Sequence, residues 1–213
     1  MKYELYKLNE NTLTIPVPNS YKDCVSLIKS DLFRLDGKMK STFSVLLKLI
    51  QPFYPTLLIW FRLSQYNGWL FPLCRFIYKI KRLKSKVDLP VSVKVGYGFY
   101  IGHGMCMVIH DNTIIGNNVN LSQFINIGSN EGTPAMVGDN VYIGPHVCLV
   151  ENVKIGNNST IGAGAVVTKD VPDNSTVVGV PAKVINYDHP GRYINNVFKC
   201  IYRTEKNANF VIS

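Results

Sequence analysis

Apolar residues recur at intervals of six through the second half of this 213-residue chain, at Val137, Ile143, Leu149, Ile155, Ile161 and Val167. Glycine directly follows four of these six residues, and a second apolar residue stands two positions before several of them. A helix repeats every 3.6 residues and a strand every two, so a period of six fits neither. The pattern predicts a chain that coils with three short strands per turn and points one apolar residue of each strand at the axis.

The same six-residue spacing extends toward the N-terminus through Val95, Ile101, Ile109, Ile115, Leu121 and Ile127. Its register slips twice, once between Ile101 and Ile109 and once between Ile127 and Val137. The core of a coil excludes insertions, so we expect the extra residues to loop outward, where binding sites are commonly built. From Val95 to Val167 the spacing allows about four coils of about 18 residues each.

Asparagine-rich pairs mark the expected corners of the coil, at 117–118, 139–140 and 157–158. Asparagine tolerates the left-handed backbone that a sharp turn requires. One buried Ile, Leu or Val contributes about 1.5–3 kcal/mol, which is comparable to the cost of ordering one or two residues. A single coil is therefore unstable, and we expect stacked coils that also bury surface against partner chains.

The five cysteines are scattered and odd in number, which is typical of reduced thiols and a cytoplasmic protein. The first residues lack the apolar core of a signal peptide. The longest uncharged apolar stretch, 49–61, is interrupted by Pro52 and Pro55 and is too short to span a bilayer. We therefore expect a chain that does not cross a membrane.

We expect three regions along the chain. Residues 1–87 form a mostly helical N-terminal region, in which prolines and the Asn67-Gly68 pair separate three or four short helices. Residues 88–185 form the coiled domain, and residues 186–213 form a C-terminal tail with a short helix and irregular chain.

An apolar and aromatic stretch, 57–78, runs into a cluster of six cations: Arg75, Lys79, Lys81, Arg82, Lys84 and Lys86. One interpretation is a packing face whose cations are solvated. The other is peripheral contact with an anionic membrane at the inner face of the cell membrane. The formal charge of +9 would also permit nucleic-acid binding, but no recognition motif accompanies it, so we expect no nucleic-acid partner.

Several motifs resemble those of a known family: the run from Val95 to Gly104 that contains His103, the segment 120–123, the run 161–172, and Gly179-Val180-Pro181-Ala182-Lys183. They resemble hexapeptide-repeat acyltransferases. Within that superfamily they are most similar to the serine acetyltransferase branch, which includes O-acetyltransferases of polysaccharide biosynthesis. The resemblance covers roughly residues 88–185.

The resemblance implies a mainly β fold, a left-handed parallel β-helix with an α-helical N-terminal region, assembled as a homotrimer or a dimer of trimers. It implies acetyl-CoA as cosubstrate, bound along the groove between neighbouring β-helices, with direct transfer of acetyl to an acceptor hydroxyl. It implies no metal.

The same resemblance implies roles for individual residues. His103 aligns with the catalytic base, a role that suits imidazole near neutral pH. Asp88, 15 residues earlier, aligns with the carboxylate that orients the imidazole. Without these roles, His103 would be a polar turn residue and Asp88 a cap at the entry to the coil. The matching cofactor positions are Ser129, Pro145, Ala163, Lys169 and Lys183, and the two lysines also fit ordinary surface charge.

Two departures from the serine-specific pattern bear on the acceptor. Gly102 stands where serine acetyltransferases have an acidic residue, and the segment 129–136 lacks their arginine–histidine pair. A site without that arginine would bind the carboxylate of serine poorly. These departures favour a small-molecule or lipid-linked sugar acceptor of capsule or O-antigen synthesis, with Glu131 as a possible contact.

Two alternatives stay open. The first is serine O-acetyltransferase activity in cysteine biosynthesis. The second is a metal-dependent hydratase of the carbonic anhydrase type, which requires three histidines around zinc. His103, His110 and His146 are available, but their spacing does not match that family, and His110 and His146 fit surface positions.

Overall fold

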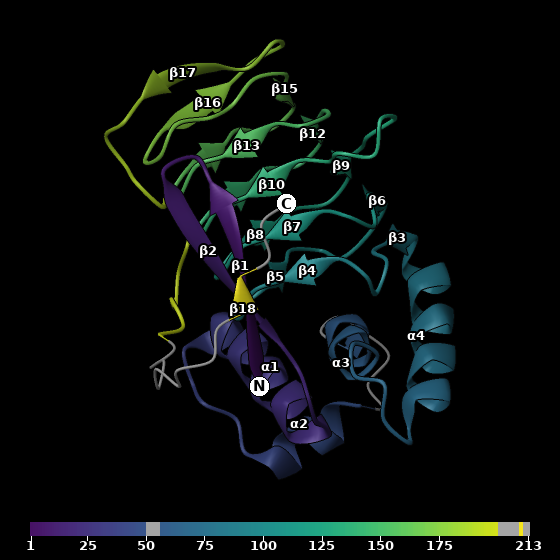
Figure 1. Cartoon of the computed structure of the whole chain (residues 1–213). Helices are drawn as coiled ribbons and strands as arrows, with labels where there is room; N and C mark the ends of the chain where they lie inside the picture. Colours follow the sequence, from purple (N-terminus) through teal and green to yellow (C-terminus); the bar gives the residue numbers. More distant parts are fainter. Residues whose placement is uncertain (50–55, 200–208, 211–213) are drawn as a thin grey trace.

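The computed structural model describes residues 1–49, 56–199 and 209–210. A stack of short strands forms one half of the molecule, and four helices lie beneath its first coil (Figure 1). A strand hairpin from the N-terminus runs alongside the stack (Figure 1). The expected coiled domain and N-terminal helices are therefore both present.

The strands make a three-sided prism, and we number its faces in the order in which the chain visits them from β4 onward. Face 1 consists of β4 (Lys94–Val95), β7 (Ile114–Ile115), β10 (Met136–Val137) and β13 (Lys154–Ile155). Face 2 consists of β5 (Tyr100–Ile101), β8 (Asn120–Leu121), β11 (Tyr142–Ile143), β14 (Thr160–Ile161), β16 (Thr176–Val178) and β17 (Lys183–Asn186). Face 3 consists of β3 (Val87–Asp88), β6 (Met107–Ile109), β9 (Asn126–Ile127), β12 (Cys148–Leu149) and β15 (Val166–Val167).

The predicted left-handed parallel β-helix is confirmed. The residues of the six-residue spacing stack in register, so that Ile143 pairs with Leu121 below it and Ile161 above it. All of them are buried along the axis. Four complete coils are present, and a fifth begins at Val171, which bridges to Ile155 on face 1, and continues in β16.

The corner between face 1 and face 2 carries a column of asparagines with left-handed backbone: Asn118, Asn140, Asn158 and Asn174, with φ of 54°, 56°, 56° and 60°. Their side chains form a ladder, because Asn140 Nδ2 donates to Asn158 Oδ1 at 3.0 Å and Asn158 Nδ2 donates to Asn174 Oδ1 at 2.9 Å. The asparagine pairs thus form the turns that the sequence predicts.

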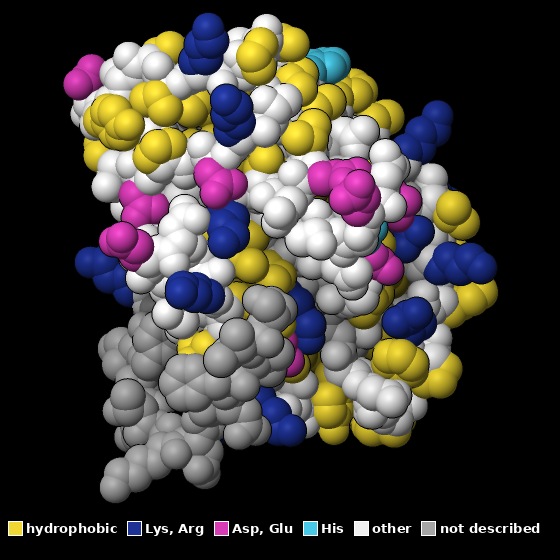
Figure 2. Space-filling model, turned by 45° about the horizontal axis from the view of Figure 1, so that its top comes forward, with side chains coloured by type: hydrophobic (Ala, Val, Ile, Leu, Met, Phe, Trp, Pro, Cys, Tyr) yellow, Lys and Arg dark blue, Asp and Glu magenta, His cyan; other side chains and the backbone are white. Residues whose placement is uncertain are grey.

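Four helices precede the β-helix: α1 (Tyr21–Asp36), α2 (Thr42–Lys48), α3 (Thr56–Leu63) and α4 (Phe71–Ser85). Helix α1 begins at Ser20, whose side chain accepts from Asp23 N–H, and ends at Gly37 with φ 68°. On the right-hand side of Figure 2, where α4 lies, basic and hydrophobic side chains face outward side by side.

Helices α1 and α3 close the first coil through buried charges. Arg62 is 0% exposed, and its guanidinium donates to both carboxylate oxygens of Asp31, at 2.8 and 3.1 Å. It also donates to the carbonyl oxygens of Val95 at 2.9 Å and Gly96 at 2.5 Å, while Asp31 accepts from Phe99 N–H at 2.8 Å. These bonds satisfy backbone groups at the open end of the prism, where no lower coil exists.

An N-terminal hairpin of β1 (Lys2–Leu8) and β2 (Asn11–Val17) covers face 1, and the sequence analysis did not anticipate it. Its buried side chains Tyr6, Leu8, Leu13 and Ile15 pack against Ile114 and Met136. The turn places Asn9 at φ 53°. Strand β18 (Asn209–Phe210) pairs with β1 in parallel.

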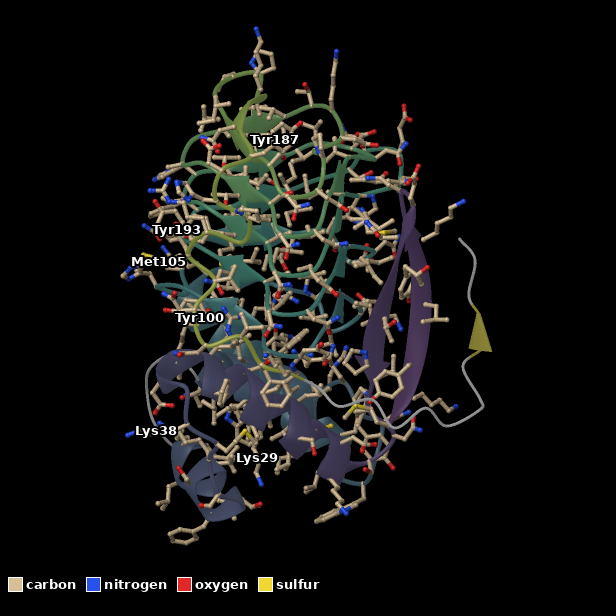
Figure 3. The ribbon with its side chains drawn as sticks, turned by 90° about the vertical axis from the view of Figure 1, so that its left-hand side faces the viewer. Lys29, Lys38, Tyr100, Met105, Tyr187 and Tyr193 are labelled. Atoms are coloured by element: carbon tan, nitrogen blue, oxygen red, sulfur yellow. The ribbon has the colours of Figure 1, made fainter. Side chains whose placement is uncertain are left out.

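The C-terminal tail first forms β17, which runs antiparallel to β16. We call the segment that follows, 187–199, the strap. It descends along face 2, as the positions of Tyr187, Tyr193 and Tyr100 show (Figure 3). The expected short helix is absent from the described part of the tail, 186–199 and 209–210, because Pro190 and the left-handed Gly191 and Asn196 interrupt any helical run.

Within the described ranges, no helix combines the length and apolar character that a membrane span requires.

Candidate active site

His103 lies in the first outward loop, at the corner between face 2 and face 3. The chain takes two residues more from Ile101 to Ile109 than from Leu121 to Ile127, although both ends pair in register. The loop is held by a bond from Gly102 N–H to Leu121 O at 2.7 Å and one from Phe124 N–H to Met105 O at 3.3 Å. Between these two anchors, His103 is exposed, with φ 63°.

Met105, next to His103 in the same loop, extends from the edge of the β-helix opposite the hairpin (Figure 3). The left-handed backbone at His103 is uncommon for a residue with a Cβ, and it turns the chain away from the coil. The imidazole therefore stands on an outward bulge rather than in the wall of the prism.

Pro145 and Ala163 occupy the same corner on the third and fourth coils. They stack directly, since Gly164 N–H donates to Pro145 O at 2.8 Å. His146 stacks on Phe124 beside this column, with ring centroids 4.6 Å apart and an angle of 18° between the rings. His146 is exposed, as its position in the sequence predicts. The stacked pair was not predicted, although both residues follow a core residue at the same spacing.

Asp88 begins face 3, and it pairs in register with Val108. Its side chain is half exposed, and Oδ1 accepts from Arg82 Nη2 at 2.8 Å. No hydrogen bond joins Asp88 to His103 in the described part of this single chain. The carboxylate still has its second oxygen available for a further donor.

Ser129 and Glu131 lie in the second outward loop, 128–135, at the corner between face 3 and face 1. A hollow of about 460 Å³ opens there, lined by Asn126, Gly128, Ser129, Asn130, Cys148, Leu149, Val150 and Glu151. Asn130 N–H donates to Glu151 Oε1 at 2.6 Å and fixes the floor of the loop. The Ser129 hydroxyl is buried and has no partner in the described chain.

An unpartnered buried hydroxyl costs about 1–3 kcal/mol, so its presence beside a hollow suits a site at which a ligand supplies the missing bond. Glu131 is exposed at the tip of the same loop. Lys169 is exposed at this corner on the fourth coil, just after β15. Lys183 is exposed at the start of β17, where it pairs with Val178. The Val178 side chain lies against Gly162, next to Ala163, so Lys183 is near that corner.

Faces 1 and 2 are covered by the chain itself, by the hairpin and the strap, whereas the outward side chains of face 3 remain accessible. Val108 is 51% exposed, Asn126 is exposed, and Cys148 is partly buried. The loops that hold His103 and Ser129 flank this face on either side. The structure thus brings most of the predicted site residues to the borders of one open face.

The described residues contain no group of three or more His, Cys, Asp and Glu side chains that could hold a metal ion. His110 contacts its neighbour Asp111, with Nδ1 3.1 Å from Oδ1.

Residues 134–169 match the family described as bacterial transferase hexapeptide (six repeats). The matched residues lie within the stacked coils, so this part of the chain resembles bacterial transferases of the hexapeptide-repeat class. Within that class it is similar to serine acetyltransferases.

The serine acetyltransferase of Bacillus pumilus is 34% identical over 127 residues, which cover 56% of this chain and 57% of that protein. The Bacillus subtilis enzyme is 33% identical over 120 residues, covering 53% of this chain and 54% of that protein. The chain therefore spans less than two thirds of the length of these relatives.

Among solved structures, Neisseria gonorrhoeae serine acetyltransferase in complex with serine has 28% identity and a TM-score of 0.55, covering 76% of this chain and 68% of that one. Brucella abortus serine acetyltransferase has a TM-score of 0.61, covering 80% of this chain and 70% of that one. Its identity is 21%, so it supports the fold alone.

Proposed function

We propose that this protein is an acetyl-CoA-dependent O-acetyltransferase. His103 takes the proton of an acceptor hydroxyl while the hydroxyl oxygen attacks the thioester carbonyl of acetyl-CoA. The new C–O bond replaces the C–S bond, and the thiol of CoA leaves with a proton returned by the imidazolium. The observation that carries the proposal is the position of His103, exposed on an outward bulge at the border of the open face.

Asp88 supports His103 in this proposal. Arg82 holds one carboxylate oxygen, and the other accepts the second N–H of the imidazole. Such a contact keeps the ring in one tautomer and stabilises the imidazolium. It requires the bulge to turn toward face 3 when substrate binds.

Acetyl-CoA is the proposed cosubstrate, and no metal takes part. It binds between neighbouring β-helices of a homotrimer, or of a dimer of trimers, where the Ser129 border of face 3 on one chain meets the Pro145 border on its neighbour. The hydroxyl of Ser129 and the backbone of Pro145 and Ala163 contact the pantetheine and nucleotide, and Lys169 and Lys183 attract the phosphates. The open face and the unpartnered Ser129 hydroxyl support this arrangement.

L-serine is the acceptor that the comparisons favour, because the relatives and structures named above are serine acetyltransferases. A sugar hydroxyl of surface-polysaccharide biosynthesis, on a nucleotide sugar or a lipid-linked oligosaccharide, is the second candidate. It is favoured by loop 128–135, which presents Glu131 and contains no arginine to hold a carboxylate. Both acceptors suit a cytoplasmic protein, and a lipid-linked one suits the inner face of the cell membrane.

An acceptor screen tests the proposal. The purified full chain is given acetyl-CoA with L-serine, nucleotide sugars or lipid-linked oligosaccharides, and thiol release is followed together with the mass of the acceptor. We expect CoA release that depends on one acceptor and adds one acetyl group to it. Turnover of L-serine would decide against the sugar, and the absence of transfer to every hydroxyl acceptor would refute the proposal.

A further inference from the structure

Helix α4 exposes an apolar stripe that no other described segment covers. Leu73, Phe76, Ile80 and Leu83 follow each other at intervals of three and four residues, so they share one side of the helix. Phe76 is 64% exposed and Leu83 68% exposed, and Trp69 just before the helix is 83% exposed. The opposite side buries Cys74 and Tyr78, the latter against Phe61 of α3.

Exposed cations flank this stripe. Arg75, Lys79, Lys84 and Lys86 are all exposed, whereas Arg82 pairs with Asp88. The sequence from Gly37 to Val87 contains no acidic residue. Figure 2 shows basic and hydrophobic side chains together along this side of the molecule.

The charge of the whole protein is concentrated in the helical region. Residues 21–86 contain 13 lysines and arginines and three acidic residues, while the rest of the chain contains ten and 11. The net charge of +9 therefore resides in the helices. A surface with this charge selects a negatively charged partner.

The helices of a second copy do not meet that requirement. Each of their three acidic residues already has a partner in its own chain. Asp23 contacts the N-terminal amine at 3.1 Å, Asp31 pairs with Arg62, and Asp36 pairs with Lys40. Pairing two α4 faces would place lysine against lysine.

A hollow of about 500 Å³ lies between α4 and residues 90–92, and Arg75, Phe76, Lys79, Arg82 and Leu83 contribute to its wall. Cations beside exposed apolar side chains match the boundary between phosphate headgroups and acyl chains. We propose that the α4 face binds the surface of an anionic phospholipid bilayer, with the apolar stripe at that boundary and the cations at the phosphates. This inference takes up the second interpretation of the aromatic and basic stretch, and it does not depend on the identity of the acceptor.

Vesicle flotation of the full-length protein tests this proposal. One set of vesicles is phosphatidylcholine, and the other contains phosphatidylglycerol as roughly one third of the lipid. We expect binding to the second set and not to the first, and weaker binding as salt is added, because salt screens the attraction.

Matched variants separate the α4 face from general surface charge. Lys79→Gln with Lys84→Gln should weaken binding to the anionic vesicles about 25-fold, since each cation near the surface contributes about fivefold. Lys2→Gln with Lys7→Gln removes the same charge from the hairpin and should have little effect. Phe76→Gln with Leu83→Gln should also release the protein, whereas Val180→Gln with Ile185→Gln, which removes exposed apolar residues at the far end, should not.

Equal binding to both vesicle sets, or no binding to either, would overturn the proposal. So would α4 variants that bind vesicles normally but change the number of chains per particle in light scattering, since the face would then be a protein interface. Acetyl transfer to a soluble acceptor is measured on the same variants and should be unchanged. A protein that binds anionic vesicles but lacks transferase activity would refute the proposed function and leave this inference standing.

Discussion

The position of His103 is set by the length of its loop rather than by a strong contact. Two additional residues in the first coil make the bulge, and the bonds at Gly102 and Met105 hold its ends. The imidazole itself has no partner among the described residues, so it is available for an acceptor hydroxyl.

Replacing His103 with alanine should reduce acetyl transfer at least about 100-fold, because a positioned general base contributes this much or more. The residue is exposed, so the free energy of unfolding should hardly change. Thiol release from acetyl-CoA measures the first quantity and urea denaturation the second. His189→Ala, at another exposed histidine, serves as the control, and equal activity in both variants would exclude His103 as the base.

Asp88→Asn should lower the maximal rate about tenfold or more and leave the KM for acetyl-CoA nearly unchanged, since the carboxylate orients the base without touching the cosubstrate. The fold should survive, because the bond to Arg82 lies on the surface. Steady-state kinetics separates the two parameters. If Asp88 only caps the entry to the β-helix, the variant will lose stability and keep its rate.

The cysteines should differ sharply in reactivity. Burial raises the pKa of the Cys24 thiol to about 12, and burial also raises the pKa of Cys74. A raised pKa leaves less thiolate at a given pH, and the thiolate is the species that reacts. Iodoacetamide at mildly alkaline pH should therefore label the exposed Cys106 before Cys24 and Cys74, as read from labelled peptides by mass spectrometry.

Cys148 lines the hollow beside Ser129, so acetyl-CoA should slow its labelling without slowing that of Cys106. Labelling of Cys24 in the folded protein as fast as that of Cys106 would contradict the burial described above.

At the scale of elements, the junction between the helices and the first coil depends on Arg62. This side chain neutralises a buried carboxylate and satisfies two carbonyl groups that have no strand below them. Burial raises the pKa of Asp31, and the adjacent guanidinium opposes that effect. The buried Asp31 carboxylate and the buried Arg62 guanidinium are therefore stable only as a pair.

Arg62→Met should lower the free energy of unfolding by about 3–5 kcal/mol, because it leaves a buried carboxylate without its partner. Lys40→Met breaks the surface pair with Asp36 and should cost far less. Urea denaturation compares the two. Equal losses would mean that the buried pair contributes no more than an exposed one.

The β-helix could be predicted from the sequence because its cause is local and periodic. The six-residue spacing from Val95 to Val167 gives the faces, and its two interruptions give the two outward loops. Those loops hold His103 and Ser129, so the borders of the candidate site also followed from the sequence. The comparisons support the transferase class, and they favour L-serine, the alternative acceptor, over the sugar.

Other features could not be predicted because distant segments create them. The hairpin forms because face 1 offers Ile114 and Met136 as a surface, although Leu13 and Ile15 alternate with Thr12 and Thr14 as a strand would. Asp88 pairs with Arg82, one of six cations that are close together in the sequence. The spacing of these cations alone does not specify which of them contacts Asp88.

At the scale of the whole molecule, two faces are covered by the chain and one is left open. The assembly should therefore form through face 3 and its borders, which would place residues of two chains around each site. A trimer of this kind also supplies the burial that a short β-helix lacks.

Val108→Glu places a charge on the outward side of face 3 and should prevent assembly and lower transferase activity together. Light scattering after size-exclusion chromatography measures the number of chains per particle. Val184→Glu adds the same charge on face 2 and should leave three chains together. A Val108→Glu protein that stays trimeric would place the interface elsewhere.

A stack of coils with a free end can fray one turn at a time, because each turn contacts only its neighbours. Here the hairpin and the strap run lengthwise and fasten the ends to each other. The hairpin contacts Lys94 near the first coil through Glu4 and Asp173 near the last coil through Asn11. The strap leads from β17 to Phe198, whose ring packs on Phe33 of α1. These contacts should keep the last turn from unfolding by itself, so we expect the repeat array to melt as a single cooperative unit.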